Sequence, residues 1–149
     1  MSQFLIRDAS VDDVGELAEI FRDASLSNED DRPILLAHPD ALDFDGQRVR
    51  AGHTIVAVAD GRIVGFATAV PESSFLELED LFVRPEHHRE GVGLTLVNGV
   101  LTRAARRGFG QLQVTANTHA MAFYLRAGFL KVGMVDTRFG PGTRMVRPI

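Results

Sequence analysis

The sequence predicts a mixed α/β (α+β) fold, a central sheet flanked by helices, from three stretches. Two apolar runs within residues 54–70 flank Asp60-Gly61, a pair typical of a two-residue hairpin turn. Residues 75–107 have the pattern of a strand, a glycine-containing loop and a long helix. The apolar run Leu112–Thr115 then follows where a parallel strand would lie. The predicted sheet is therefore mixed.

Composition indicates one ordinary globular domain over residues 1–149. Of its residues, 45% are hydrophobic and 24% are charged, as in soluble proteins. The net charge of −4 disfavours a general nucleic-acid partner. There is no cysteine, which excludes disulfides and a thiolate nucleophile. The N-terminal segment lacks a signal-peptide core, and no apolar run is long enough for a membrane span. We therefore expect a cytoplasmic protein without a membrane partner.

The first third of the chain predicts a strand, a helix and a less regular region. Phe4–Arg7 is a short strand, and Ser10 is a good N-cap for a helix with an apolar stripe. Residues 25–52 are irregular, with a short helix predicted at 34–36 and a short turn at 40–44. The acidic cluster at 29–31 is interpreted as a solvated loop rather than a substrate contact.

The last third predicts one helix and two strands. Thr118–Ala127 forms the helix, and Gly128 ends it in the left-handed conformation. Lys131–Asp136 and Thr143–Arg147 are the strands, joined by a loop at Thr137–Gly142.

The loop before the long helix predicts an anion site at His88–Leu94. The first N–H groups of a helix have no internal acceptor, and glycines let a phosphate approach the backbone. The nucleotide P-loop is disfavoured because no lysine follows Gly93. The dinucleotide fingerprint is disfavoured because Leu96 replaces its third glycine. A tight turn that needs small residues is the alternative.

Two motifs resemble those of the GNAT N-acetyltransferase superfamily. The first has Leu81, Val83 and Pro85 before the segment HREGVG at 88–93, similar to the family's [RQ]-x-x-G-x-[GA] loop. The second is NTHAMAFYLRAGF at 117–129, which fills every specified position of N-x-x-A-x-x-F-Y-x-x-x-G-F. His88 departs from the family's Arg or Gln, so a side-chain contact to phosphate there is in doubt.

The resemblance implies a sheet that is mostly antiparallel, with splayed parallel strands that bind acetyl-CoA as co-substrate. The pantetheine arm would bond to the backbone of Leu81 and Val83, and one amide would polarise the thioester carbonyl. These residues are otherwise core strand residues. The cofactor residues that the resemblance implies are Leu81, Phe82, Val83, His88, Arg89, Glu90, Gly91, Val92, Gly93, Leu94, Asn117, Phe123 and Tyr124.

Tyr124 holds the family position of the acid that protonates the departing thiolate. Its alternative role is a buried, hydrogen-bonded tyrosine, and that of Asn117 is a helix N-cap. Glu77 and Glu79 lie on one strand face and are candidates for the base that deprotonates an amine. We prefer Glu79; the alternative is a solvent-facing polar strand side. His87 and His88 point in different directions, so no metal site is expected.

The expected function is therefore acetyl transfer from acetyl-CoA to a primary amine, by direct attack in a ternary complex. The alternative is an acyl-CoA sensor or partner protein without turnover. Neither the acceptor, a small molecule or a peptide amine, nor the oligomeric state follows from the sequence. A homodimer is compatible with the apolar C-terminal strands.

Overall fold

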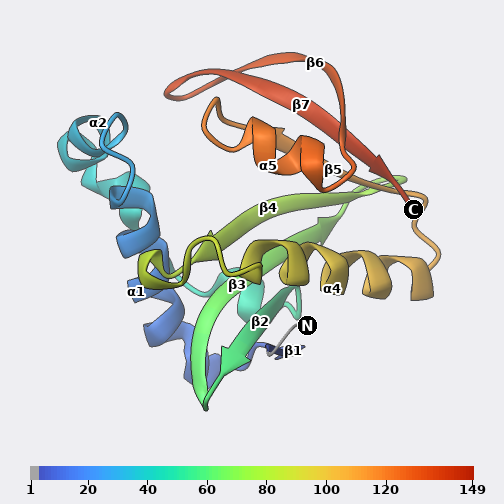
Figure 1. Cartoon of the computed structure of the whole chain (residues 1–149), viewed down its shortest axis with the longest axis horizontal. Coiled ribbons are helices and arrows are strands. Elements are labelled where there is room, and N and C mark those ends of the chain that lie inside the picture. The colour runs from blue at the N-terminus through green and yellow to red at the C-terminus, as the bar shows by residue number, and fades with distance from the viewer. Residues whose placement is uncertain (1–3) are drawn as a thin grey trace. The chain divides into compact units, whose positions relative to one another are not determined.

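The computed structural model describes residues 4–149 and contains a seven-stranded mixed sheet with helices (Figure 1). The strand order is β1-β2-β3-β4-β5-β7-β6. β4 pairs with β5 in parallel, whereas β1 with β2, β2 with β3, β5 with β7 and β6 with β7 are antiparallel. Two compact units share this chain. The first comprises the residues up to Thr68 together with Asp80–Leu96, and the second comprises Ala69–Glu79 together with Val97–Ile149.

The first unit is built on an antiparallel hairpin. β2 (Thr54–Ala59) pairs with β1 (Leu5–Asp8) and with β3 (Arg62–Pro71). The predicted turn is confirmed, because Asp60 and Gly61 both have positive φ, 52° and 76°. The register shifts at Val64 of β3, which forms a β-bulge.

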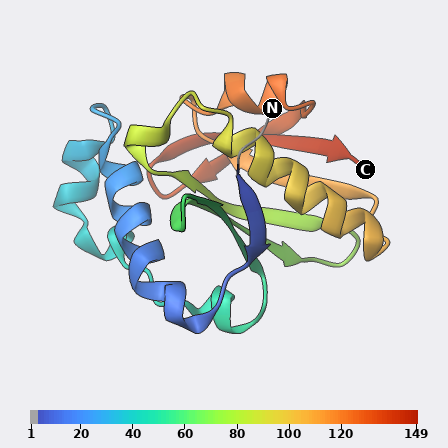
Figure 2. The same cartoon turned by 60° about the horizontal axis from the view of Figure 1, so that its bottom comes forward.

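Helix α1 (Val14–Leu26) covers this hairpin (Figure 2). Leu17 and Ile20 are fully buried against Val56, Ile63 and Phe66. Ser10, the predicted N-cap, precedes a 3-10 turn over Val11–Asp13 (η1) that leads into α1. Its backbone N–H donates to the Asp13 carboxylate at 2.8 Å. The apolar stripe of the sequence therefore forms the core of this unit.

The irregular region contains three short helices. α2 (Arg32–Ala37) and the 3-10 turn η2 (Pro39–Leu42) lie close to the predicted helix and turn. α3 (Gln47–Arg50) was not predicted, because four residues are too few for a periodic pattern.

The second unit contains the parallel pair. In β4 (Leu76–Val83) and β5 (Gln111–Ala116), Leu76 lies opposite Leu112 and Leu78 opposite Val114. This register ends at Leu78, while β4 continues to Val83. The crossover helix α4 (Val92–Arg106) begins in the first unit and ends in the second, where Gly108 has φ 81°. The predicted strand–helix–strand order is confirmed.

The last two strands form a tighter hairpin than predicted. β6 (Leu130–Thr137) and β7 (Gly140–Pro148) pair along most of their length, so the loop predicted at Thr137–Gly142 is wrong. Gly142 is a strand residue, and a Cβ there would lie 2.6 Å from the Thr115 methyl group. Gly142 is instead needed for the close approach of β5 and β7.

Helix α5 (Met121–Arg126) is shorter than the predicted Thr118–Ala127. Residues 118–120 form a turn, in which the Asn117 side chain accepts the N–H of Ala120 at 2.9 Å. Gly128 has φ 94° and ends the helix as predicted. Within residues 4–149, no helix is both long and apolar enough to cross a bilayer.

Candidate active site

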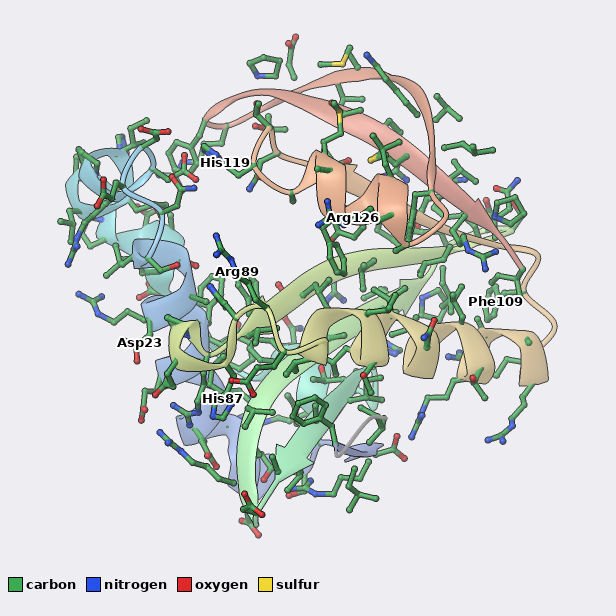
Figure 3. The ribbon with its side chains drawn as sticks, in the orientation of Figure 1. Asp23, His87, Arg89, Phe109, His119 and Arg126 are labelled. Atoms are coloured by element: carbon green, nitrogen blue, oxygen red, sulfur yellow. The ribbon has the colours of Figure 1, made fainter. Side chains whose placement is uncertain are left out.

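The segment between β4 and α4 is a tight, strained loop. A 3-10 turn over Pro85–His87 (η3) leads into residues 88–91, and α4 begins at Val92. Arg89 has φ 66°, which is uncommon for a residue with a side chain, and Gly91 has φ 84°. Such strain is concentrated at ligand-binding sites. In Figure 3 the side chains of His87 and Arg89 leave this segment in different directions.

Two histidines brace the loop from different sides. His88 places its Nε2 3.0 Å from the carbonyl oxygen of Val83, at the end of β4. The Nδ1 atom of His87 lies 3.1 Å from a carboxylate oxygen of Glu90. The two rings therefore have separate partners, as expected, and His88 turns back to the strand. Within residues 4–149, no cluster of three His, Asp or Glu side chains has a geometry suited to a metal ion.

The start of α4 is seated on β3. Val92 and Leu96 are buried, whereas Gly91 and Leu94 are exposed. A Cβ at Gly91 would meet nothing within 4 Å, so this edge of the loop is open. The Thr95 N–H and hydroxyl both bond the Gly91 carbonyl, at 3.0 and 2.9 Å. The preceding N–H groups of this first turn have no acceptor one turn back and make an anion-binding end.

The last residues of β4 lie beside this loop in the sequence. Leu81, Phe82 and Val83 are half-buried. The Phe82 ring packs against Phe21 and Phe66, with centroids 4.9 and 5.7 Å away. Its side chain is therefore part of the core, and only its backbone is available to a ligand.

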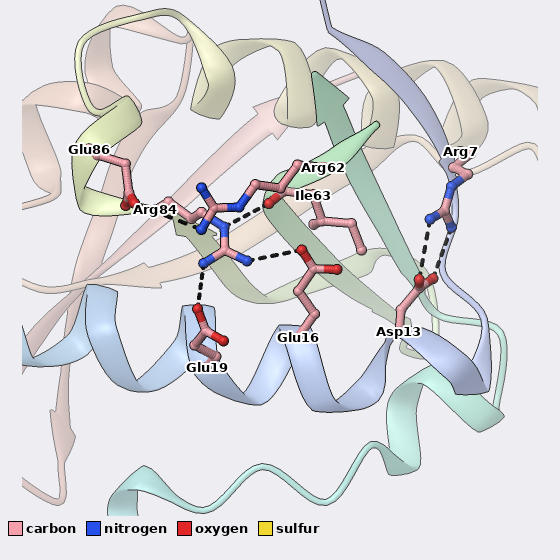
Figure 4. A network of polar contacts seen from close by, with 8 residues as sticks. All are labelled: Arg7, Asp13, Glu16, Glu19, Arg62, Ile63, Arg84 and Glu86. Carbon is pink, nitrogen blue, oxygen red and sulfur yellow. Dashed lines mark hydrogen bonds and ion pairs between the residues drawn. The ribbon is translucent and has the colours of Figure 1, made fainter. Parts of the chain in front are cut away.

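Arg84, which sequence reasoning missed, joins β4 to the loop and is 3% exposed (Figure 4). Its guanidinium donates to the carboxylates of Glu19 and Glu16, at 2.8 and 3.0 Å, and to the carbonyl oxygen of Ile63 at 2.7 Å. Burial alone lowers the pKa of Arg84, but the two glutamates outweigh it and raise the pKa above its usual value. The arginine is therefore a permanently charged, buried residue.

In the second unit, Glu77 is bound by an arginine. The Arg144 guanidinium holds both carboxylate oxygens of Glu77, one of them at 2.7 Å. It also donates to Gln113 at 2.8 Å and to Thr115 at 3.0 Å. This contact with Glu77 raises the pKa of Arg144. The sequence offered no signal for this pair, whose members are 67 residues apart.

Glu79 differs from Glu77 in its surroundings. Its side chain is exposed, two residues further along β4, whereas Glu77 is only 19% exposed. The two candidate bases therefore share a strand, and Glu77 is the more enclosed of the two and has a bidentate contact with Arg144.

Tyr124 is the buried aromatic centre of α5. Its ring meets Phe123 and Phe129 edge-on, at centroid distances of 5.1 and 5.2 Å, and it is 6% exposed. Burial raises the pKa of Tyr124 above its ordinary value of 10. Its phenol is therefore protonated throughout the neutral range. Phe123 is half-buried and Asn117, which caps the turn before α5, is exposed.

Comparison with known proteins identifies the family. A profile of the acetyltransferase (GNAT) family matches residues 16–129. Streptothricin acetyltransferase from Streptomyces lavendulae is 37% identical over 125 residues, which cover 76% of this chain and 65% of that protein. The chain spans between 38% and 65% of the length of curated relatives that it matches.

Solved structures give the same answer for the fold. A PaiA N-acetyltransferase from Thermoplasma acidophilum, in complex with coenzyme A, aligns over the whole of both chains with a TM-score of 0.79 and 20% identity. A nourseothricin acetyltransferase is 30% identical over 64% of each chain, with a TM-score of 0.58. These solved structures share the fold of this chain, a mixed sheet flanked by helices. The chain belongs to the acetyltransferase (GNAT) family.

Proposed function

We propose that this protein transfers an acetyl group from acetyl-CoA to a primary amine, by direct attack in a ternary complex. The observation that carries the proposal is the family match together with the strained, open turn at the start of α4. The turn presents unpaired N–H groups and the positive end of a 15-residue helix, which suit a pyrophosphate.

The proposed cofactor residues lie in this turn and at the end of β4. Backbone groups of Gly91, Val92, Gly93 and Leu94 would hold the pyrophosphate. The register of β4 with β5 ends at Leu78, and the backbone of Leu81 and Val83 beyond it would bond the pantetheine arm like an added strand. One of these amides would polarise the thioester carbonyl, as an oxyanion donor does.

The chemistry requires two proton transfers. The neutral amine attacks the thioester carbonyl carbon, its extra proton goes to a base, and the C–S bond breaks as the sulfur leaves. We propose Glu79 as the base, directly or through water, because Arg144 holds the carboxylate of Glu77 in a bidentate pair. The Glu79 side chain is exposed, so a cationic acceptor can approach it from solvent.

Tyr124 would give its hydroxyl proton to the departing sulfur. Burial raises its pKa above 10, so the hydroxyl carries its proton at neutral pH. A high pKa also makes the tyrosinate costly, so we propose that the proton moves as the C–S bond breaks and is replaced from solvent.

Streptothricin is the acceptor to test first. The relative named for acetylating it is 37% identical to this chain, and a nourseothricin acetyltransferase is 30% identical. Small primary amines and an N-terminal peptide amine complete the panel, and free CoA thiol is the product to measure.

The test of cofactor binding is a calorimetric titration with acetyl-CoA. Wild-type protein should bind one equivalent, and Gly91→Asp should lose measurable binding because a carboxylate would face the phosphates. Gly108→Asp is the matched control, since Gly108 has nearly the same φ (81°) and equally open space but lies past the other end of α4. Equal loss in both variants, or none in Gly91→Asp, would place the pyrophosphate elsewhere.

The acid assignment has its own test. Tyr124→Phe should lower kcat by about 10²-fold or more with little change in acetyl-CoA affinity. Between pH 8 and 10 the rates of wild type and variant should have the same pH dependence. The raised pKa keeps Tyr124 protonated in this range, so its ionisation adds no fall to the wild-type profile. A collapse of affinity with kcat preserved would make Tyr124 a packing residue, and unchanged turnover would exclude it as the acid.

A further inference from the structure

We propose that Arg84 is a positioning residue, which holds the loop at 88–91 in the conformation that receives the pyrophosphate of acetyl-CoA. This inference rests on the proposed function, and it adds a residue that touches neither the cofactor nor the acceptor. The contacts that support it lie within the first unit, at the two ends of the loop.

The first end of the loop is fixed by Arg84 to two consecutive carbonyl groups of β3. Its backbone N–H donates to Val64 at 2.8 Å, and its Nε donates to Ile63 at 2.7 Å. Val64 is the bulged residue of β3, and bulges commonly re-aim backbone groups beside functional sites. The chain therefore leaves β4 in one defined direction.

The second end of the loop is fixed to the next residue of β3. A Cβ at Gly65 would lie 3.1 Å from Val92 and 3.2 Å from Leu96, both in the first turns of α4, and 2.9 Å from the Phe82 carbonyl oxygen. Only glycine lets β4 and α4 approach β3 this closely. Residues 63–65 thus anchor both ends of the same short loop.

The guanidinium adds a third element to this anchor. Glu16 and Glu19 of α1 accept hydrogen bonds from its two terminal nitrogens (Figure 4). Arg84 therefore joins helix α1, strand β3 and the start of the loop through one buried cation. An exposed pair between Glu86 and Arg62, at 4.0 Å, is a weaker tie between η3 and β3. A shift of α1 would therefore reach the loop through Arg84.

The distribution of charge indicates positioning more than stability. The glutamate side chains are 36% and 57% exposed, so water can solvate them, while the arginine is buried. Replacing both members of a buried ion pair by apolar side chains is often neutral for stability, and such pairs are retained in some proteins for conformational specificity. Removing the arginine alone leaves two glutamates that water already reaches. Arg84 is thus expected to matter more for the geometry of the loop than for unfolding.

The experiment compares Arg84→Met with Arg7→Gln, which breaks an ion pair of the same unit that does not involve the loop. Acetyl-CoA affinity is measured by calorimetry well below the melting temperature of each variant. Arg84→Met should weaken binding about tenfold or more, the scale of a lost hydrogen bond to a charged group, while Arg7→Gln stays within about twofold. Glu19→Gln keeps Glu16 in place and should weaken binding by a smaller factor.

Hydrogen exchange supplies a readout that a loss of overall stability would not move selectively. Amides of residues 85–95 should exchange faster in Arg84→Met, while those of β2 keep their wild-type rates. If Arg84→Met binds acetyl-CoA like wild type with unchanged exchange in the loop, or if Arg7→Gln weakens binding equally, Arg84 is not a positioning residue. Absence of binding by the wild-type protein would instead overturn the proposed function, and this inference with it.

Discussion

Two arginine clusters, one in each compact unit, use the same chemistry in opposite ways. Arg84 in the first unit is 3% exposed, and its two glutamates are largely at the surface. Arg144 in the second unit is 21% exposed, and its partner Glu77 is 19% exposed. In the first cluster the cation is the enclosed member, whereas in the second the cation and the anion are enclosed to the same degree.

The difference shows which member of each cluster has freedom to do chemistry. The glutamates beside Arg84 can be hydrated or replaced singly, so that cluster acts through the geometry of the arginine. Glu77 is held at both carboxylate oxygens by the Arg144 guanidinium, whose planar fork matches the shape of a carboxylate. Arg144 therefore gives Glu77 surroundings that differ from the exposed position of Glu79, and we propose that the two carboxylates have different roles.

The largest expected effect separates these two carboxylates in catalysis. Glu79→Gln should lower kcat by about 10²- to 10⁴-fold at pH 7, because a base is lost. The rate should partly recover as the pH approaches the pKa of the acceptor amine, because more of the amine is then neutral and hydroxide takes up the proton that it loses on attack. Glu77→Gln is the matched variant, with a smaller fall. Steady-state kinetics from pH 6 to 10 provide the measurement, and a larger fall in Glu77→Gln would reverse the assignment.

The second effect tests the same pair for stability. Glu77→Gln removes a charge-assisted pair that solvent screens only partly, so the free energy of unfolding should fall by about 1.5–3 kcal/mol. Glu79→Gln, at an exposed position, should cost less than about 1 kcal/mol. Urea unfolding at pH 7 measures both. Equal losses would mean that the Arg144 contact does not distinguish the two carboxylates.

The sequence was sufficient where a local pattern determines the structure. Asp60-Gly61 predicted a turn that needs two positive φ values, and the helical spacing from Val92 onward predicted α4. The glycines before α4 predicted a turn, and Gly91 there has φ 84° and open space beside it, while the anion site at this turn stays a prediction. These features depend on neighbours within a few residues, which a single sequence displays.

The sequence failed where distant residues determine the structure. Arg84 meets glutamates 65 and 68 residues away, and no local rule distinguishes it from an arginine at the surface. Gly142 was interpreted as part of a loop, because the close approach of Thr115 that requires a glycine is set by strand pairing. The shorter α5 has a local cause instead, since the Asn117 side chain caps a turn over residues 118–120 rather than the helix itself.

The smallest effect concerns the ion pair between Arg7 and Asp13, and it extends the comparison to a cation that is more exposed than Arg84 or Arg144 (Figure 4). The hydrogen bond from Arg7, at 2.8 Å, lowers the pKa of Asp13 below its ordinary value of 3.8. A lowered pKa in the folded state means that the pair stabilises the fold above pH 3.8, and that this contribution is lost as the pH falls through the folded-state pKa. Because Arg7 is 41% exposed, we expect the pair to contribute less than about 1 kcal/mol to the free energy of unfolding.

The free energies of unfolding of wild type and Asp13→Asn in urea should differ by a constant amount above pH 5 and converge toward pH 2.5. Arg7→Gln should show a similar loss at pH 7. A difference that persists at pH 2.5 would mean that Asp13 stabilises η1 through its contact with Ser10 rather than through its charge.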